Sequence, residues 1–88
     1  MKYRVETTPQ FDKEFKKLDK YTMKMIKSWI TNHLVNCENP RSFGKGLTSN
    51  RSGQWRYRIG DYRLICKIDD GELIILALSV GHRRDIYD

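Results

Sequence analysis

A stretch in the second half of the chain alternates apolar and basic residues around a glycine: Gln54-Trp55-Arg56-Tyr57-Arg58-Ile59-Gly60-Asp61-Tyr62-Arg63-Leu64-Ile65-Cys66. Alternation with a period of two is typical of β-strands. Glycine at the first position of a two-residue loop favours a type II′ turn, which fixes the register of the strands that it joins. We therefore predict a hairpin of strands 54–59 and 62–68, with Ile59 opposite Tyr62 and its aromatic residues in the core.

The other face of this hairpin is basic. In the predicted register Arg58 lies opposite Arg63, and Arg56 emerges on the same side two residues away. Like charges directly opposite one another destabilise a pair of strands. Stability alone does not favour this arrangement, so the three arginines indicate a surface that binds a polyanion.

A third strand is predicted over residues 72–80, after a type I′ turn at Asp70-Gly71. Residues 73–78 are apolar without interruption, so this strand is expected to be buried on both faces and central in the sheet. If it is central, a strand from the N-terminus pairs along its free edge.

The first half of the chain predicts one strand and two helices. Residues 2–7 alternate as a short half-buried strand does, and Thr8-Pro9 supplies an N-cap followed by proline at the first helical position. A break near Asp19–Thr22 separates the helices. Each helix has an apolar stripe, and the two stripes consist of Phe11, Phe15 and Leu18, and of Ile26, Trp29, Ile30, His33, Leu34 and Cys37.

These elements predict an α+β fold. We expect an N-terminal strand, two antiparallel helices and a three-stranded antiparallel meander, which together form one four-stranded twisted sheet, followed by a short basic C-terminal tail. The loop over residues 38–53 has no regular period, and Phe43 and Leu47 are its candidate anchors. No repeat or linker divides the chain, so residues 1–88 are expected to form a single domain.

Length and charge limit the classes of function. The chain has 88 residues, a length that excludes a multidomain enzyme. Its net charge of +6 points to nucleic acid or an acidic protein as partner. Lysine supplies eight of the ten cations in residues 1–50, whereas arginine supplies six of the seven in residues 51–88. Two cysteines and the lack of a signal peptide or membrane span indicate the cytoplasm and no membrane partner.

Two segments carry a resemblance to a known family. Residues 53–63, around Trp55-Arg56-Tyr57-Arg58, and residues 80–87, Val80-Gly81-His82-Arg83-Arg84-Asp85-Ile86-Tyr87, resemble the RelE branch of the RelE/ParE toxin superfamily. The order of predicted elements agrees with that family over the whole chain, as a single RelE-like toxin domain.

The resemblance implies a type II toxin that enters the A site of the 30S ribosomal subunit and cleaves mRNA there. It implies that the 2′-hydroxyl attacks the adjacent phosphorus without a metal or other cofactor, leaving a 2′,3′-cyclic phosphate. It also implies a cognate acidic antitoxin, RelB-like, which neutralises the toxin, so that translation is inhibited only when the toxin is free.

Matched by motif, three residues are the candidate catalytic groups: Tyr87 as base, Arg63 as phosphate stabiliser and Arg83 as stabiliser or acid at the leaving oxygen. Tyrosine is a poor base at neutral pH unless nearby cations favour its anion. The candidate RNA- and phosphate-binding residues are Arg56, Arg58, Arg84 and His82.

Other interpretations of single residues stay open. Tyr87 could belong to a frayed tail, and His82 could be a surface residue that follows a glycine turn or an acid–base group. His33 lies on an apolar stripe and is expected to be a satisfied, half-buried histidine. A zinc site would have to combine His33, Cys37, Cys66 and His82, but no Cys-x-x-Cys pair exists, so we expect no metal.

Three other functions are compatible with the same fold. The first is a gyrase poison of the ParE branch, which would not need the set of Arg63, Arg83 and Tyr87. The second is a non-catalytic RNA-binding module that uses the arginine face. The third is an inactive relative that assembles a repressor with its antitoxin.

Overall fold

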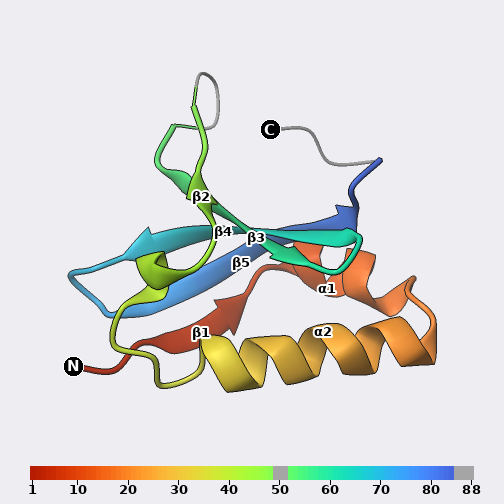
Figure 1. Cartoon of the computed structure of the whole chain (residues 1–88), viewed down its shortest axis with the longest axis horizontal. Coiled ribbons are helices and arrows are strands. Elements are labelled where there is room, and N and C mark those ends of the chain that lie inside the picture. The colour runs from red at the N-terminus through yellow and green to blue at the C-terminus, as the bar shows by residue number, and fades with distance from the viewer. Residues whose placement is uncertain (49–51, 85–88) are drawn as a thin grey trace.

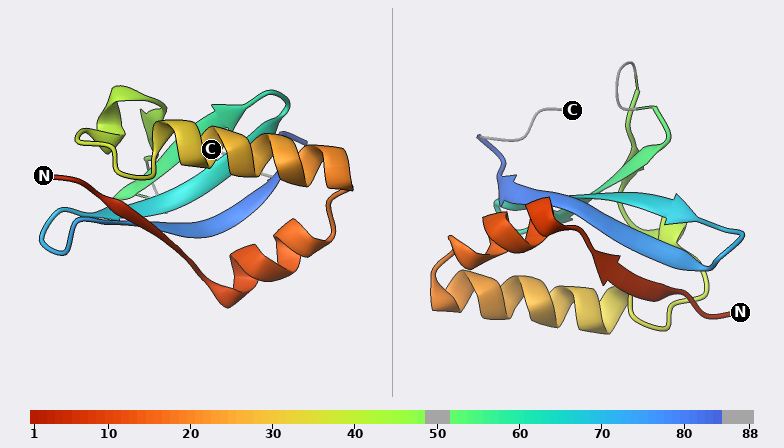
Figure 2. Two further views of the ribbon diagram at one scale, coloured as in Figure 1. Left: turned by 90° about the horizontal axis from the view of Figure 1, so that it is seen from below. Right: turned by 180° about the vertical axis from the view of Figure 1, so that it is seen from behind.

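The computed structural model describes residues 1–48 and 52–84, and it has the predicted α+β class. Both helices lie on one face of a twisted sheet, and the second helix runs back in roughly the opposite direction to the first (Figures 1 and 2). In chain order the elements are β1 (Arg4–Thr7), α1 (Pro9–Lys16), α2 (Lys20–His33), a 3-10 turn η1 (Pro40–Ser42), β2 (Lys45–Gly46), β3 (Gln54–Ile59), β4 (Tyr62–Asp69) and β5 (Ile74–His82).

The sheet has five strands in the order β1-β5-β4-β3-β2, so the predicted count of four was wrong. The additional strand, β2, pairs only Lys45 with Arg56 and Gly46 with Trp55, which is too short to show a period in the sequence. The N-terminal strand pairs with β5 as predicted, and the pairing is parallel. As a result β5 is an interior strand along residues 74–77.

The β3–β4 hairpin has the predicted register throughout, including the pairs Arg58 with Arg63 and Ile59 with Tyr62. Gly60 has a φ of +59°, and Asp61 is not among the described residues with positive φ. A positive φ at the first loop residue alone is what a type II′ turn requires. The glycine therefore sets the register of the two strands that carry the arginines.

The predicted β4–β5 turn was wrong. Asp69 pairs with Ile74, so four residues form the loop and β5 begins at Ile74 rather than at residue 72. A type I′ turn requires positive φ at both central residues, but in this loop the residue with positive φ is Leu73, at +56°. The side chain of Asp69 closes the loop locally, because its Oδ1 accepts a hydrogen bond of 3.0 Å from the backbone N–H of Glu72.

Each helix begins directly after a residue with an extended backbone at its N-cap position. The hydroxyl of Thr8 accepts a hydrogen bond from the backbone N–H of Phe11, as an N-cap does, and Pro9 occupies the first turn. Asp19 has an extended backbone and occupies the N-cap position of α2 without a capping hydrogen bond from its side chain, and the helix already begins at Lys20. The predicted break over Asp19–Thr22 was therefore placed too late along the chain.

The main core lies between the helices and the sheet. Ile26 of α2, Tyr57 of β3 and Cys66 of β4 are fully buried in it, as predicted. A second, smaller cluster of Leu47, Ile65 and Leu78 lies on the opposite face of the sheet. Leu47 thus anchors its loop as predicted, whereas Phe43 is 41% exposed and contacts the rings of α2 only at its edge.

Candidate functional site

The arginines of the hairpin lie on the face of the sheet away from the two helices. Arg56 and Arg58 alternate with the buried Tyr57, and Arg63 lies directly opposite Arg58. Among the described residues, this face is covered only by the small cluster around Ile65 and by the loop that carries β2 (Figure 1). The register therefore brings the three guanidinium groups together on an accessible surface.

The electrostatics of Arg56 confirms that the groups are close. Burial of this half-buried side chain lowers the pKa of Arg56 from its ordinary value, and the positive charges of Arg63 and Arg58 lower it further. The two neighbouring cations thus disfavour the charged form of Arg56. An anion placed between them would remove this repulsion.

A pocket of about 170 Å³ lies beside the turn that joins β3 to β4. It is lined by Arg58, Gly60, Asp61, Arg63 and Arg83, and we call it the arginine pocket. This volume is well above the ~10–15 Å³ that a single water needs. Three guanidinium groups, each with a planar set of donors, make it suited to a phosphate group.

Arg83 reaches the pocket because the end of β5 lies beside the β3–β4 turn (Figure 1). The backbone N–H of Arg83 donates a hydrogen bond of 2.9 Å to the carbonyl of Asp61. The Nε atom of Arg63, at the floor of the same region, is buried, so its guanidinium is held in place by its surroundings. Two segments that are 20 residues apart in sequence thus share one pocket.

Asp61 is the lining residue that sequence reasoning missed. It was assigned only to the turn, although its place between Arg58 and Arg63 in the hairpin was a signal that its carboxylate would lie near them. A carboxylate in the pocket reduces the net positive charge that an incoming anion meets.

The other predicted site residues lie elsewhere or cannot be placed. His82 lies opposite Tyr62, with the two rings edge to face and their centroids 5.4 Å apart, so it shares the helix side of the sheet with Tyr62. Arg84 is exposed, and its backbone N–H donates to Nδ1 of His82. Neither residue is among those that line the arginine pocket. Tyr87 lies outside the described residues.

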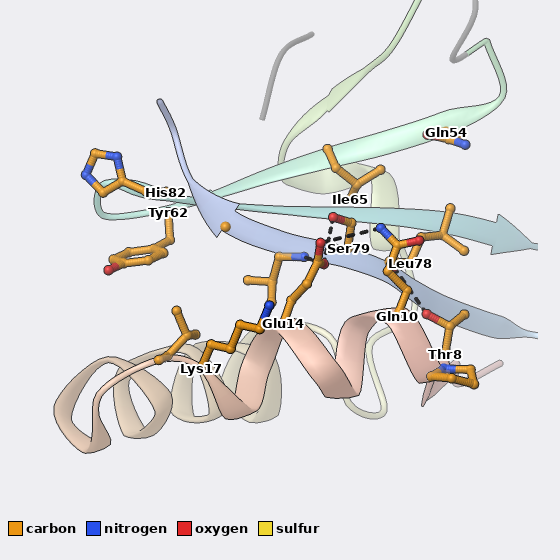
Figure 3. A pocket seen from close by; sticks show the side chains of 14 residues that line it. Thr8, Gln10, Glu14, Lys17, Gln54, Tyr62, Ile65, Leu78, Ser79 and His82 are labelled. Carbon is orange, nitrogen blue, oxygen red and sulfur yellow. Dashed lines mark hydrogen bonds between the residues drawn. The ribbon is translucent and has the colours of Figure 1, made fainter. Parts of the chain in front are cut away.

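A larger open groove of about 840 Å³ runs along α1 and the part of β5 beyond β1 (Figure 3). Glu14 lies at its centre, where Oε1 accepts hydrogen bonds from Oγ of Ser79 at 2.9 Å and from the backbone N–H of Val80 at 3.0 Å. Because β1 pairs only with residues 74–77, β5 has an open edge from there on. The carboxylate of Glu14 satisfies the exposed donors of this edge.

The histidines and cysteines do not come together as a metal site in the part of the chain that the structure describes. Nδ1 of His33 lies 2.9 Å from the carbonyl oxygen of Trp29, and its ring stacks on that indole, which is the satisfied role predicted for it. Burial raises the pKa of the thiols of Cys66 and Cys37. In the same described ranges, no helix is long and apolar enough to cross a membrane.

The family model that matches this chain is described as "ParE toxin of type II toxin-antitoxin system, parDE" and covers residues 5–87. A curated relative, toxin RelG of Mycobacterium tuberculosis, is 42% identical over 48 residues, which are 54% of this chain and 55% of that protein. The chain thus spans about half the length of this relative.

Solved structures share the whole fold. A chain of the toxin–antitoxin complex RelBE2 from Mycobacterium tuberculosis superposes with a TM-score of 0.85 at 28% identity, over 94% of this chain and 93% of that one. The isolated Escherichia coli RelE toxin superposes with a TM-score of 0.70 at 18% identity, over 91% of this chain and 83% of that one. The similarity to the second structure, at so low an identity, bears on the fold alone.

Proposed function

This chain belongs to the ParE toxin family of type II toxin–antitoxin systems, within the RelE/ParE superfamily, and we propose that it is a ribosome-dependent endoribonuclease of the RelE type. In this proposal the toxin enters the A site of the 30S subunit, cleaves the mRNA there and thereby inhibits translation. The observation that carries the proposal is the arginine pocket, in which side chains from two separate segments converge.

The pocket matches what cleavage of a phosphodiester requires. When the 2′-oxygen bonds to phosphorus, negative charge grows on the non-bridging phosphate oxygens and then on the 5′-oxygen as its bond to phosphorus breaks. Preorganised positive donors at these positions are the most effective stabilisers of such a transition state. Arg63, with its buried Nε, is assigned to the phosphate oxygens, and Arg83 to the leaving 5′-oxygen.

The proton balance requires a base and an acid. The 2′-hydroxyl loses its proton to the base, for which the proposed residue is Tyr87. The 5′-oxygen gains a proton from the acid, for which the proposed residue is Arg83, as its bond to phosphorus breaks, and it leaves as a hydroxyl. Arginines that lie close to a tyrosine favour its anion, which is the form that accepts the proton. Arg56 and Arg58 are assigned to the RNA backbone on the sheet face next to the pocket.

The proposed protein partner is an acidic antitoxin of the RelB kind. The net charge of +6 supports an acidic partner, and the similar chain of known structure comes from a toxin–antitoxin complex. An antitoxin that places carboxylates on the arginine face would compete with RNA for the same groups. A small acidic protein encoded next to this chain is therefore expected.

A second candidate function is poisoning of DNA gyrase, which is favoured by the ParE name of the matching family model. Gyrase inhibition does not call for a pocket that grips a single phosphate next to a base. The two functions therefore differ in their dependence on Arg63 and Tyr87.

The test is cleavage of mRNA on programmed ribosomes, with the 5′ ends mapped, by the wild type, Arg63→Ala and Tyr87→Phe. Removing one preorganised donor typically lowers the rate by about 10²–10³-fold, and we expect a loss of this order for Arg63→Ala. Arg4→Ala is the matched control, because this exposed arginine of β1 pairs with Glu6 of its own strand and lies outside the arginine pocket.

Two results would contradict the proposal in different ways. An intact message together with inhibited DNA supercoiling would replace it with the gyrase function. Cleavage that both Arg63→Ala and Tyr87→Phe leave at the wild-type rate would reject the assignment of the site but not the activity.

A further inference from the structure

The segment Gly81–Arg84 connects β5 to the arginine pocket, and two hydrogen bonds determine its path. The backbone N–H of Arg83 donates to the carbonyl of Asp61 at 2.9 Å. One residue later, the backbone N–H of Arg84 donates to Nδ1 of His82 at 3.2 Å. Arg83, which is one of the residues that line the pocket, lies between the two residues that the second bond joins.

This second bond can form in only one protonation state of His82. A backbone N–H can only donate, so Nδ1 must carry a lone pair and the imidazole must be uncharged, with its proton on Nε2. The ring also rests edge to face on Tyr62, at a centroid distance of 5.4 Å. His82 is thus fixed on one side by the sheet and on the other by the turn that follows it.

We infer that His82 is a positioning residue, whose uncharged ring closes the turn that places Arg83 in the arginine pocket. This inference rests on the proposed function only in that Arg83 must hold a phosphate. It differs from the sequence-based prediction, in which His82 itself was a phosphate-binding residue, because the ring of His82 lies against Tyr62 (Figure 3) and His82 is not among the residues that line the arginine pocket.

Protonation acts on this turn directly. Imidazole changes its charge between pH 5 and 8, and a proton on Nδ1 would place two donors, the ring N–H and the backbone N–H of Arg84, against each other. The hydrogen bond would be lost, and Arg83 would be held only through Asp61. Acid pH should therefore lower the affinity of the pocket for an anion. If His82 contacted the anion directly, its protonation would raise this affinity instead.

The groups around His82 come from β4, from α1 and from the turn itself. Tyr62 contacts the ring, and Lys17 and Glu14 of α1 line the same groove. Glu14 already accepts hydrogen bonds from Ser79 and Val80, and Figure 3 places it apart from His82. Arg83 and Arg84 follow His82 directly in the chain.

The test uses sulfate as the probe, because its charge does not change between pH 5.5 and 7.5. Binding is followed by NMR at the Nε–H of Arg83, together with the backbone amide of Arg84, in the wild type, His82→Ala and His82→Asn. An asparagine oxygen can accept from the N–H two residues on, as in an Asx-turn, but it does not titrate. His33→Gln is the control for the other histidine, which lies at the far end of α2.

We expect the sulfate affinity of the wild type to fall about three- to ten-fold between pH 7.5 and 5.5, which is the effect of losing one hydrogen bond. The NMR signal of the Arg84 backbone amide should shift over the same pH range. His82→Asn should bind like the wild type at pH 7.5 and show no pH dependence, and His82→Ala should be weak at both values. Affinity that rises on acidification, or an Asn variant as weak as the Ala variant at pH 7.5, would overturn the inference.

The same variants separate this inference from the proposed function. If the sulfate and amide data agree with it but the wild type leaves mRNA intact on programmed ribosomes, the positioning role stands and the proposed activity fails. If mRNA is cleaved but the amide of Arg84 does not respond to pH, the activity stands and the positioning role fails.

Discussion

Asp70 shows how a single side chain can join distant parts of this chain. Its carboxylate accepts hydrogen bonds from both terminal nitrogens of Arg41, at 3.0 and 3.1 Å, and from the hydroxyl of Tyr3, at 2.5 Å. It thereby connects the β4–β5 loop with η1 and with the N-terminus. The hydrogen bonds from Arg41 and Tyr3 lower the pKa of Asp70, and the bond to Asp70 raises the pKa of Tyr3.

These directions predict how stability depends on pH. The folded-state pKa of Asp70 lies below its unfolded value of about 4, so its stabilisation is present at neutral pH and is lost as the pH falls through the folded value. For Tyr3 the folded pKa lies above the unfolded one, so its contribution is lost only at alkaline pH. We expect Asp70→Asn to lower Tm at pH 7 and the difference from the wild type to shrink toward pH 2–3.

Thermal unfolding followed by circular dichroism measures both effects. Glu72→Gln is the matched control, because it removes a carboxylate from the same loop and keeps the backbone N–H through which Glu72 bonds to Asp69. An equal difference between Asp70→Asn and the wild type at pH 7 and at pH 2.5 would show that the carboxylate charge does not stabilise the fold.

At the scale of elements, β2 depends on one glycine. Gly44 has a φ of +78°, and a Cβ atom there would lie 2.2 Å from the carbonyl oxygen of Arg56 and 2.9 Å from Nε1 of Trp55. Both contacts involve β3, and Nε1 of Trp55 also donates to the carbonyl of Phe43 at 2.6 Å. Residue 44 must therefore be a glycine for the loop to lie against β3.

Gly53 provides the matched comparison for Gly44. It also has a positive φ, +92°, but no atom lies within 4 Å of where its Cβ would be. Gly53→Ala should thus cost only the backbone strain, about 1 kcal/mol, whereas Gly44→Ala adds a steric clash and should cost more than ~2 kcal/mol. Urea denaturation gives both free energies, and equal values would contradict the close approach of the loop to β3.

The pairing of β2 also adds a cation to the arginine face. Lys45 lies directly opposite Arg56, so basic residues extend across three neighbouring strands. Each phosphate neutralised on single-stranded RNA contributes about 0.7 to the slope of log affinity against log salt concentration. Lys45→Gln should reduce this slope by about that amount in binding to a single-stranded RNA, and Lys20→Gln, on α2, should leave it unchanged.

The sequence predictions were accurate where neighbouring residues determine an element and wrong where distant contacts determine it. The β3–β4 register was predictable because Gly60 specifies the turn and Tyr57 and Leu64 specify the buried face. The β4–β5 loop was not, because Leu73 adopts a backbone conformation that a leucine rarely takes and that its surroundings impose. A shift of register between Ile65 and Cys66 left no trace in the sequence.

The residues of the candidate site also divide into those that a local pattern predicts and those that it does not. Arg56, Arg58 and Arg63 could be grouped from the hairpin alone, since alternation and one turn place them. The arrival of Arg83 beside Asp61 depends on the whole length of β5 and on a backbone hydrogen bond to a turn 22 residues earlier. That contact and the position of His82 outside the pocket depend on tertiary structure, which no local sequence pattern specifies.

Over the molecule as a whole, the lysines of the helices and the arginines of the hairpin lie on different sides of the sheet. The lysines of α1 and α2, among them Lys13, Lys24 and Lys27, are exposed on the helices, which cover one face of the sheet (Figure 1). The register places the arginines of β3 and β4 on the other face. Charges at a distance accelerate the approach of a polyanion and are screened by salt. Groups in a pocket act on the bound phosphate itself.

We therefore expect changes to the helix lysines and changes to the pocket arginines to affect two different kinetic steps on the ribosome. The combined change of Lys13, Lys24 and Lys27 to Gln halves the net charge of +6, and it should slow association about ten-fold at low salt and progressively less as salt rises. Cleavage by the bound toxin should stay at the wild-type rate. Arg58→Gln should do the reverse, because Arg58 lines the arginine pocket while most of the charge that attracts the toxin remains.

Single-turnover cleavage at several toxin concentrations and two salt concentrations separates the association rate from the rate at saturation. A lysine variant that cleaves slowly even at saturation would place the helix face in the catalytic contact, against the position of the pocket on the opposite side of the sheet. An Arg58→Gln variant that is slow only in association would make the pocket a part of the attracting surface. The location of each charge, rather than the total, then determines which step it controls.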